Sequence, residues 1–298
     1  MGWRTLLISQ HAKISLTSGN LVIQTDSERY HTPVRDINVL LIQSLQVVIT
    51  TAAVAAQAEA HAKIIFTGRD GQPICETTEC YPHARTAALV RQQVGWSEGR
   101  IENLWTRVVA AKIQNQIAVG NLLEVATNDL SSELEKLELN DATNREAVVA
   151  RQYFPLIFGK DFSRSDLVPI NAALNYGYSI LLSLVNRIIV SRGYLTCFGI
   201  HHDNAFNLAS DLMEPFRPII DYWVAQQKIR DLTPDVKFGL ARLFELEMRY
   251  NGKQEVLSNV VEKVIVQCLK YLSEETETIR IEVDVPDEVS NYAINDYV

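Results

Sequence analysis

The sequence predicts an α+β protein in which a small N-terminal β-rich domain precedes a larger all-α domain. Apolar residues alternate with polar ones in the first part of the chain, which is the period of strands. From Ala84 onward they recur at helical spacing. With 298 residues, 47% of them hydrophobic, the chain is long enough to bury the cores of two domains.

Short alternating or β-branched runs predict the strands of the first domain. The predicted strands are residues 5–8, 13–16, 20–24, 39–42, 47–50 and 64–66. The first three form a β-hairpin around the turn Ser18-Gly19-Asn20. The alanine-rich stretch 51–61 favours a helix.

A turn at Gly68 to Pro73 closes this part of the chain, and polar residues follow it. We therefore expect a β-rich domain over 1–74, a linker over 75–83 and a helical domain over 84–298. One helix carries an apolar stripe formed by Leu181, Leu184, Val185, Ile188 and Ile189. Loops are expected near Gly159, Gly193 and Asn251-Gly252, and the acidic tail from Ser273 is expected to fray.

Composition excludes several classes of protein. No run of about 18 uncharged apolar residues predicts a membrane span, and Met1-Gly2-Trp3-Arg4 does not begin a signal peptide. Cytoplasmic residence follows. The four cysteines lack the paired spacing of a structural zinc site.

The charge balance restricts how the chain could bind nucleic acid. Its 28 basic and 36 acidic residues give a formal net charge of -8, the wrong sign for coating nucleic acid by bulk electrostatics. Any DNA contact must be a local basic strip, and a partner protein could supply part of the positive surface.

Three segments hold most of the chemistry: 144–147 (NREA), 199–202 (GIHH) and 211–218 (DLMEPFRP). Carboxylates with one imidazole form an oxygen-rich set that suits Mg²⁺ or Mn²⁺. Such a cation polarises a phosphodiester and stabilises charge on the attacking or leaving oxygen, so phosphoryl transfer needs no protein nucleophile.

Each segment also has a structural interpretation. Thr143-x-x-Glu146 and Asp211-x-x-Glu214 both fit a capping box, in which the glutamates would only satisfy amides at helix starts. The adjacent histidines His201 and His202 could be ordinary surface residues.

Taken together, longer stretches resemble a known family. They are Gly2-Trp3-Arg4-Thr5 with the hairpin after it, 81–85 (YPHAR), 105–116 (WTRVVAAKIQNQ), 144–146 (NRE), 166–182 and 207–221 (NLASDLMEPFRPIID). In this order, over almost the whole chain, they resemble the CRISPR-associated integrase family Cas-one, specifically its type II branch. The resemblance implies an N-terminal β-domain that dimerises, a linker and a helical catalytic domain.

The resemblance also implies the metal ligands and catalytic residues. The family's glutamate falls on Glu146 and its last acid on Glu214. Its histidine falls on His202, because the family has a histidine, one residue and then Asn; His201 is the alternative. Asp211 belongs to the same motif and either ligates or orients the metal.

The implied activity is that of a DNA endonuclease and integrase dependent on Mg²⁺ or Mn²⁺. The 3′-hydroxyl of a short foreign DNA, the prespacer, attacks a phosphodiester at the edge of a CRISPR repeat in double-stranded DNA. Arg145 and Arg217 would contact phosphate or form structural ion pairs. The implied partners are a second copy of the chain, a small Cas-two dimer, the type II effector nuclease and an accessory ring-forming protein.

Two rival functions use the same residues differently. A metal-dependent DNA repair nuclease would cleave without joining. A non-catalytic DNA-binding scaffold would use its acids only as helix caps.

Overall fold

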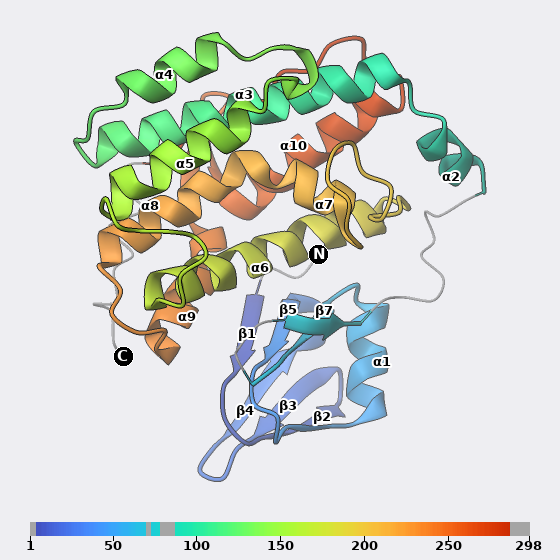
Figure 1. The fold of residues 1–298 in the computed structure, drawn as a ribbon. Coiled ribbons are helices and arrows are strands. Elements are labelled where there is room, and N and C mark those ends of the chain that lie inside the picture. Colours follow the sequence, from blue (N-terminus) through green and yellow to red (C-terminus); the bar gives the residue numbers. More distant parts are fainter. Residues whose placement is uncertain (1–3, 70–72, 78–86, 287–298) are drawn as a thin grey trace. The chain divides into compact units, whose positions relative to one another are not determined.

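The computed structural model describes residues 4–69, 73–77 and 87–286, and the chain divides into two compact units, Met1–Pro82 and His83–Val298. Strands make up most of the first unit and helices most of the second (Figure 1). The predicted α+β class is confirmed. The opening residues 1–3, residues 78–83 of the predicted linker and the motif 81–85 lie outside the described residues.

Two four-stranded sheets form the first unit, in the orders β1-β5-β7-β8 and β4-β3-β2-β6. The strands are β1 (Arg4–Ile8), β2 (Lys13–Thr17), β3 (Asn20–Gln24), β4 (Arg29–Pro33), β5 (Ile37–Ile42), β6 (Val48–Ile49), β7 (Lys63–Thr67) and β8 (Pro73–Glu76). One apolar cluster takes side chains from both sheets and from helix α1 (Thr51–Glu59), including Ile14, Leu40, Ala53 and Ile64. The sheets and the helix therefore share a single core.

The predicted hairpin is confirmed in part. β2 and β3 pair antiparallel, and Ser18 and Gly19 between them have φ of 49° and 74°, the left-handed values of a tight hairpin turn. β1 does not join them, because it pairs in parallel with β5 in the other sheet. Parallel pairing depends on residues distant in sequence, which the local pattern cannot indicate.

The predicted linker 75–83 begins too early. Cys75 and Glu76 belong to β8, an edge strand that pairs antiparallel with β7. Lys63 Nζ lies 3.3 Å from the Glu76 carboxylate and donates to the backbone oxygen of Thr77 at 2.9 Å. These contacts between β7 and β8 stabilise the polar end of β8 as a strand, where the sequence predicted the start of the linker.

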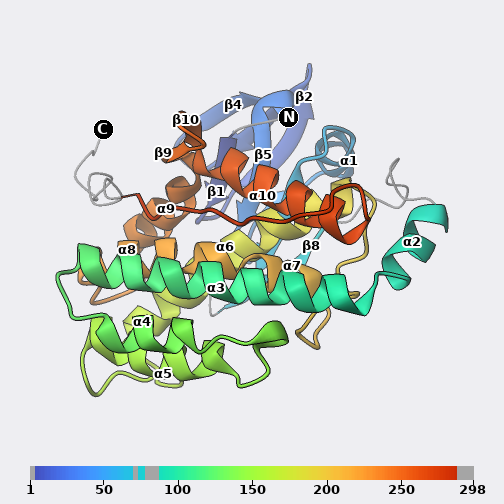
Figure 2. The same ribbon diagram turned by 90° about the horizontal axis from the view of Figure 1, so that it is seen from above.

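Nine α-helices lie in the described part of the second unit, and short 3₁₀ helices connect some of them. They are α2 (Ala87–Val94), α3 (Glu98–Leu122), α4 (Asn128–Glu135), α5 (Arg145–Phe158), α6 (Pro169–Ser191), α7 (Asn207–Leu212), α8 (Arg217–Gln227), α9 (Pro234–Arg242) and α10 (Leu257–Leu272), with short 3₁₀ turns that include η2 (Leu139–Asp141) and η3 (Glu214–Phe216). The long helix α3 contacts α4 and α5 as well as α8 and α10 (Figure 2). It is the element on which the unit is assembled.

Helix α6 is the other central helix, and it contacts α8, α9 and α10. All five residues of the predicted apolar stripe, which begins at Leu181 and ends at Ile189, are buried, which confirms that prediction. By length and composition α6 could also cross a membrane, contrary to the expectation from sequence, but 61% of its most apolar window is buried inside the molecule. It has the burial of a core helix.

The predicted loop at Asn251-Gly252 is a turn with φ of 51° and 76°. It connects two strands, β9 (Glu247–Tyr250) and β10 (Lys253–Val256), which pair antiparallel. The helical unit thus contains a β-hairpin that was not predicted, although Asn-Gly is a strong hairpin signal.

The predicted frayed tail is wrong for the residues that the structure describes. Alternate side chains of this extended segment are buried: Ile279, Ile281 and Val283. Arg100 of α3 donates to the backbone oxygens of Tyr271 and Thr276 at 2.9 and 2.7 Å. Burial of every second side chain and the hydrogen bond from Arg100, which is distant in sequence, keep this segment in place.

Candidate active site

The three segments singled out in the sequence surround one face of α3. Glu146 lies in the first turn of α5, His202 in the loop before α7, Asp211 in α7 and Glu214 in η3. Because α3 contacts α5, α7 and η3, these residues approach a single helix from separate elements.

Two prolines set the position of Glu214. Pro215 has no N–H with which to extend α7, so the chain tightens into η3, and Pro218 then stands in the first turn of α8, where its missing N–H is not needed. Asn115 of α3 donates to the Pro215 backbone oxygen at 2.7 Å. The Glu214 side chain is thereby fixed against α3 and is only 3% exposed.

Glu146 does not act in a helix cap. The Asn144 side chain caps α5, and the Asp141 carboxylate accepts the backbone N–H groups of Arg145 and Glu146 at 2.6 and 3.1 Å. The capping-box interpretation of Thr143-x-x-Glu146 is therefore wrong. Since the amides are already satisfied, the Glu146 carboxylate can point elsewhere.

A lysine lies between the two glutamates. Lys112 of α3 donates a short hydrogen bond to Glu146 Oε1, and its Nζ lies 2.5 Å from Glu214 Oε2. The second contact lacks hydrogen-bond geometry, so Glu214 Oε2 is a buried oxygen with an ion pair but no hydrogen bond. The other oxygen, Oε1, lies 3.0 Å from Arg217 Nη2.

These contacts shift the pKa values of the buried pair. Burial disfavours the charged form of Lys112, yet Glu214 and Glu146 outweigh it and leave the lysine pKa above 10.5. Burial likewise opposes ionisation of Glu214, but Arg217 and Lys112 hold the pKa of this carboxyl below 4.5. Both groups are charged at neutral pH, and the glutamate carries the negative charge that a cation site requires.

Asp211 organises the loop that carries His202. Its fully buried carboxylate accepts the backbone N–H groups of Ile200, His201 and His202 at 2.6, 3.2 and 2.9 Å. Gly199 allows this approach, because a Cβ there would lie 2.5 Å from Asp211 Oδ2. Asp211 therefore caps the preceding loop, and its predicted capping-box role at a helix start is wrong.

The same carboxylate fixes the tautomer of His202. His202 Nδ1 lies 2.7 Å from Asp211 Oδ1, and because a carboxylate only accepts, Nδ1 carries the proton. The lone pair of the neutral ring is then on Nε2. This hydrogen bond raises the pKa of His202 above 6.5, while burial opposes the shift.

The two histidines have different surroundings. The His201 ring stacks on the buried Trp105 ring, with centroids 4.0 Å apart and planes 8° apart. The His202 ring meets the edge of the same indole at 5.7 Å and is held by Asp211. Orientation by a carboxylate is typical of metal-binding histidines, so the geometry favours His202 over His201.

The two predicted phosphate contacts are both engaged in ion pairs. Arg145 Nη1 lies 2.6 Å from Glu133 Oε2. Arg217 pairs with Glu214, and its guanidinium lies 4.8 Å from the centroid of the Tyr178 ring. The structure brings Arg217 into the site and directs Arg145 to α4.

The donor set fits a hard divalent cation. Among the described residues, no three His, Cys, Asp or Glu side chains already stand in the arrangement of a metal site. Two carboxylates nevertheless converge on one cation, the Lys112 ammonium, and one of them offers a buried oxygen without a hydrogen bond. Glu146, Glu214 and His202 Nε2 provide the oxygen and nitrogen ligands that Mg²⁺ or Mn²⁺ accepts.

Sequence reasoning missed Lys112 and Trp105. Both lie within the stretch 105–116, which contributed to the family resemblance. Lys112 occupies a position between apolar residues of α3 that are buried, such as Val108, Val109 and Ile113. A charge on a buried helix face needs a buried partner, and this was the signal available.

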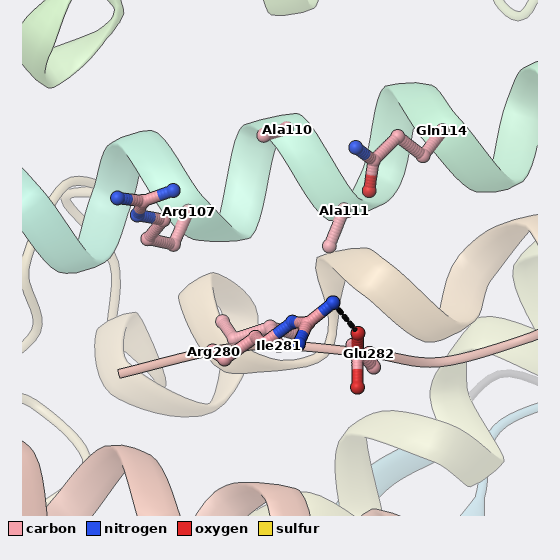
Figure 3. A pocket seen from close by; sticks show the side chains of 7 residues that line it. All are labelled: Arg107, Ala110, Ala111, Gln114, Arg280, Ile281 and Glu282. Atoms are coloured by element: carbon pink, nitrogen blue, oxygen red, sulfur yellow. Dashed lines mark ion pairs between the residues drawn. The ribbon is translucent and has the colours of Figure 1, made fainter. Parts of the chain in front are cut away.

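A separate cavity lies on the other side of α3. It measures about 190 Å³ and is lined by Arg107, Ala110, Ala111, Gln114, Arg280, Ile281 and Glu282 (Figure 3). At 3.6 residues per turn, positions 107, 110 and 114 face away from Lys112. The cavity is formed by the C-terminal segment against α3, and no acid or histidine of the candidate site lines it.

Comparison with known proteins decides the family. The family described as CRISPR associated protein Cas1 matches residues 6–260. The chain belongs to the Cas1 family. A curated Cas1 relative, the CRISPR-associated endonuclease Cas1 of Neisseria meningitidis serogroup C (strain 8013), is 31% identical over 277 residues, which are 89% of this chain and 90% of the relative. The resemblance seen in the motifs is confirmed, and the type II branch fits this relative.

More distant Cas1 proteins are also similar. The CRISPR-associated endonuclease Cas1 2 of Pyrobaculum aerophilum is 27% identical, over 74% of this chain and 81% of its own length. Among solved structures, a casposase bound to integration product has a TM-score of 0.78 at 20% identity, covering 99% of this chain and 96% of the casposase. A CAS1 protein from Thermotoga maritima has a TM-score of 0.77 at 15% identity, covering 90% and 97%. These two structures support the Cas1 fold.

Proposed function

We propose that this Cas1 protein is a divalent-metal-dependent integrase that inserts prespacers into a CRISPR array. The 3′-hydroxyl of the prespacer attacks a phosphodiester at the repeat edge in double-stranded DNA. The supporting observation is that two buried or half-buried glutamates converge on one cation beside a histidine whose Nδ1 is held by the Asp211 carboxylate.

In this proposal Glu146, Glu214 and His202 hold Mg²⁺ or Mn²⁺. When bound, the cation polarises the phosphodiester and stabilises charge on the attacking and leaving oxygens. Asp211 keeps the His202 proton on Nδ1 and the ring in place. Arg217 neutralises one oxygen of Glu214 and leaves the other for the cation.

The rival functions differ in what they require of these residues. A scaffold needs its acids as helix caps, and neither Glu146 nor Glu214 caps a helix through its side chain. A repair nuclease uses the same metal site, so the product has to separate it from an integrase. Integration is favoured because the fold matches a casposase solved with integration product over 99% of the chain.

The proposal includes partners. One chain of a Cas6-RT-Cas1--Cas2 complex is similar to this chain, with a TM-score of 0.73 at 20% identity, over 96% of this chain and 36% of that chain. We infer a homodimer, formed through the β-rich unit, that assembles with a Cas2 dimer in the cytoplasm. In a type II system the effector nuclease and an accessory ring protein join it. The net charge of -8 makes a positively charged partner surface useful for holding DNA.

The experiment uses purified protein, with and without Cas2, a prespacer duplex, a supercoiled repeat plasmid and Mg²⁺ or Mn²⁺. Wild type should give metal-dependent joined product, and Glu146→Gln should lose it. Glu262→Gln is the matched control, because that carboxylate pairs with Arg192 at 2.9 Å outside the site. Cleavage without joining would favour the repair nuclease, and no chemistry under any condition would favour the scaffold.

A further inference from the structure

Lys112 occupies the position at which the two candidate ligands meet. Its side chain is 9% exposed, and its ammonium contacts Glu146 Oε1 and Glu214 Oε2. The Glu214 side chain is 3% exposed, so this carboxylate has little water available to replace a lost partner. Without a cation between them, the two glutamates would repel each other in a region of low dielectric constant.

A divalent cation would compete with this ammonium. Mg²⁺ binds carboxylate oxygens at about 2.0–2.1 Å, and Arg217 already holds Glu214 Oε1 at 3.0 Å. The oxygen left for the metal is Oε2, from which Lys112 Nζ lies 2.5 Å away. Two cations that close together in a buried site repel strongly, so one must leave.

We propose that Lys112 is a positioning residue that substitutes for the metal ion. Its ammonium holds Glu146 and Glu214 together before a divalent cation binds, and it releases Glu214 Oε2 when the cation arrives. This inference rests on the proposed metal site.

The surroundings permit such an exchange. Asn115 anchors α3 to the Pro215 backbone oxygen at 2.7 Å, so the helix can stay in place while the flexible lysine stem moves. The Glu146 side chain is 27% exposed, which provides a wetter side toward which the ammonium can withdraw. The site therefore exchanges one internal cation for one external cation without unfolding a helix.

The exchange weakens the apparent metal affinity. Only molecules in which Lys112 has left Glu214 are competent to bind, and the apparent affinity falls in proportion to their fraction. If about one tenth of the molecules are competent, removing the ammonium should tighten Mn²⁺ binding about tenfold.

The test measures the Mn²⁺ dissociation constant by calorimetry and by electron paramagnetic resonance, together with the melting temperature with and without Mn²⁺. Lys112→Met should bind Mn²⁺ about tenfold more tightly than wild type. It should also melt at a lower temperature without metal and recover most of that loss with Mn²⁺. Lys112→Arg should restore the metal-free melting temperature. Lys63→Met is the matched control, because Lys63 is 10% exposed and pairs with Glu76 in the other unit.

A second measurement needs no variant. Lysine acylation of wild type, followed by peptide mass spectrometry, should show that Lys112 becomes more reactive with Mn²⁺ while Lys63 does not change. Unchanged Lys112 reactivity would overturn the inference. If wild type binds Mn²⁺ and Lys112→Met binds it no more tightly, the inference about Lys112 is overturned but the proposed metal site is not. Saturable Mn²⁺ binding by neither protein would overturn the proposed metal site as well.

Discussion

Asp211→Asn separates the orienting role of Asp211 from simple burial of a charge. The carboxylate accepts four hydrogen bonds: those of Ile200 and His201 on Oδ2, and those of the His202 backbone and ring on Oδ1. An asparagine keeps one accepting oxygen, so its NH₂ group must face two of the four donors. Each buried donor left without an acceptor costs about 1–3 kcal/mol.

The two orientations of the new amide are not equivalent. With the NH₂ toward Ile200 and His201, both backbone donors are lost, at about 2–6 kcal/mol. With the NH₂ toward His202, the ring can move its proton to Nε2, and Nδ1 then accepts from the amide. Only one donor is lost, so this orientation should prevail, with a loss of about 1–3 kcal/mol. Nε2 then carries a proton and cannot bind a metal.

We therefore expect Asp211→Asn to fold, to lose about 1–3 kcal/mol of unfolding free energy, and to bind Mn²⁺ about 10–100-fold more weakly. Urea unfolding measures the first quantity, calorimetry the second, and ¹⁵N-histidine NMR the tautomer. Asp221→Asn is the control. Asp221 accepts a hydrogen bond from the Tyr178 hydroxyl, and the amide oxygen of an asparagine can still accept it. Unchanged Mn²⁺ affinity in Asp211→Asn, with Nδ1 still protonated, would refute the reasoning.

Three further predictions concern the same site. DNA joining should be abolished by each of the substitutions Glu146→Gln, His202→Ala and Glu214→Gln. Glu214→Gln should also lower stability, because Glu214 is the most buried of the three residues. If a variant still joins DNA, the residue it replaces is not a required ligand. The pKa of His202 is raised above 6.5, and metal binding requires the neutral ring, so Mn²⁺ affinity should decline as pH falls through that raised pKa. In the metal-free protein the trend is the opposite. The His202–Asp211 pair contributes its full stabilisation below pH 6.5, and this contribution is lost as pH rises through the raised pKa. Calorimetry from pH 8 to 5.5 tests the first trend, and an affinity that does not change over this range argues against histidine ligation. Gly199→Ala should destabilise by about 1–3 kcal/mol, since the new Cβ would lie 2.5 Å from Asp211 Oδ2, and urea unfolding equal to wild type would show that the loop relaxes freely.

Local patterns predicted much of the fold. The stripe from Leu181 to Ile189 is buried in α6 as its spacing requires, and Ser18-Gly19 makes the turn between β2 and β3. Errors arose where partners are distant in sequence. β1 pairs with β5, and Ile279, Ile281 and Val283 of the acidic C-terminal segment are buried.

The sequence by itself determined the fold class, the Cas1 family and the three segments that carry the candidate ligands, because periodicity and motif order are properties of the chain. Only the tertiary structure decided what each side chain does. It showed that Asp141 and Asn144 satisfy the start of α5, that Asp211 holds His202, and that Lys112 lies between Glu146 and Glu214. The reason is physical: a hydrogen bond or ion pair depends on distances between atoms, and Lys112 and Glu146, 34 positions apart in the sequence, meet only after the helices have packed.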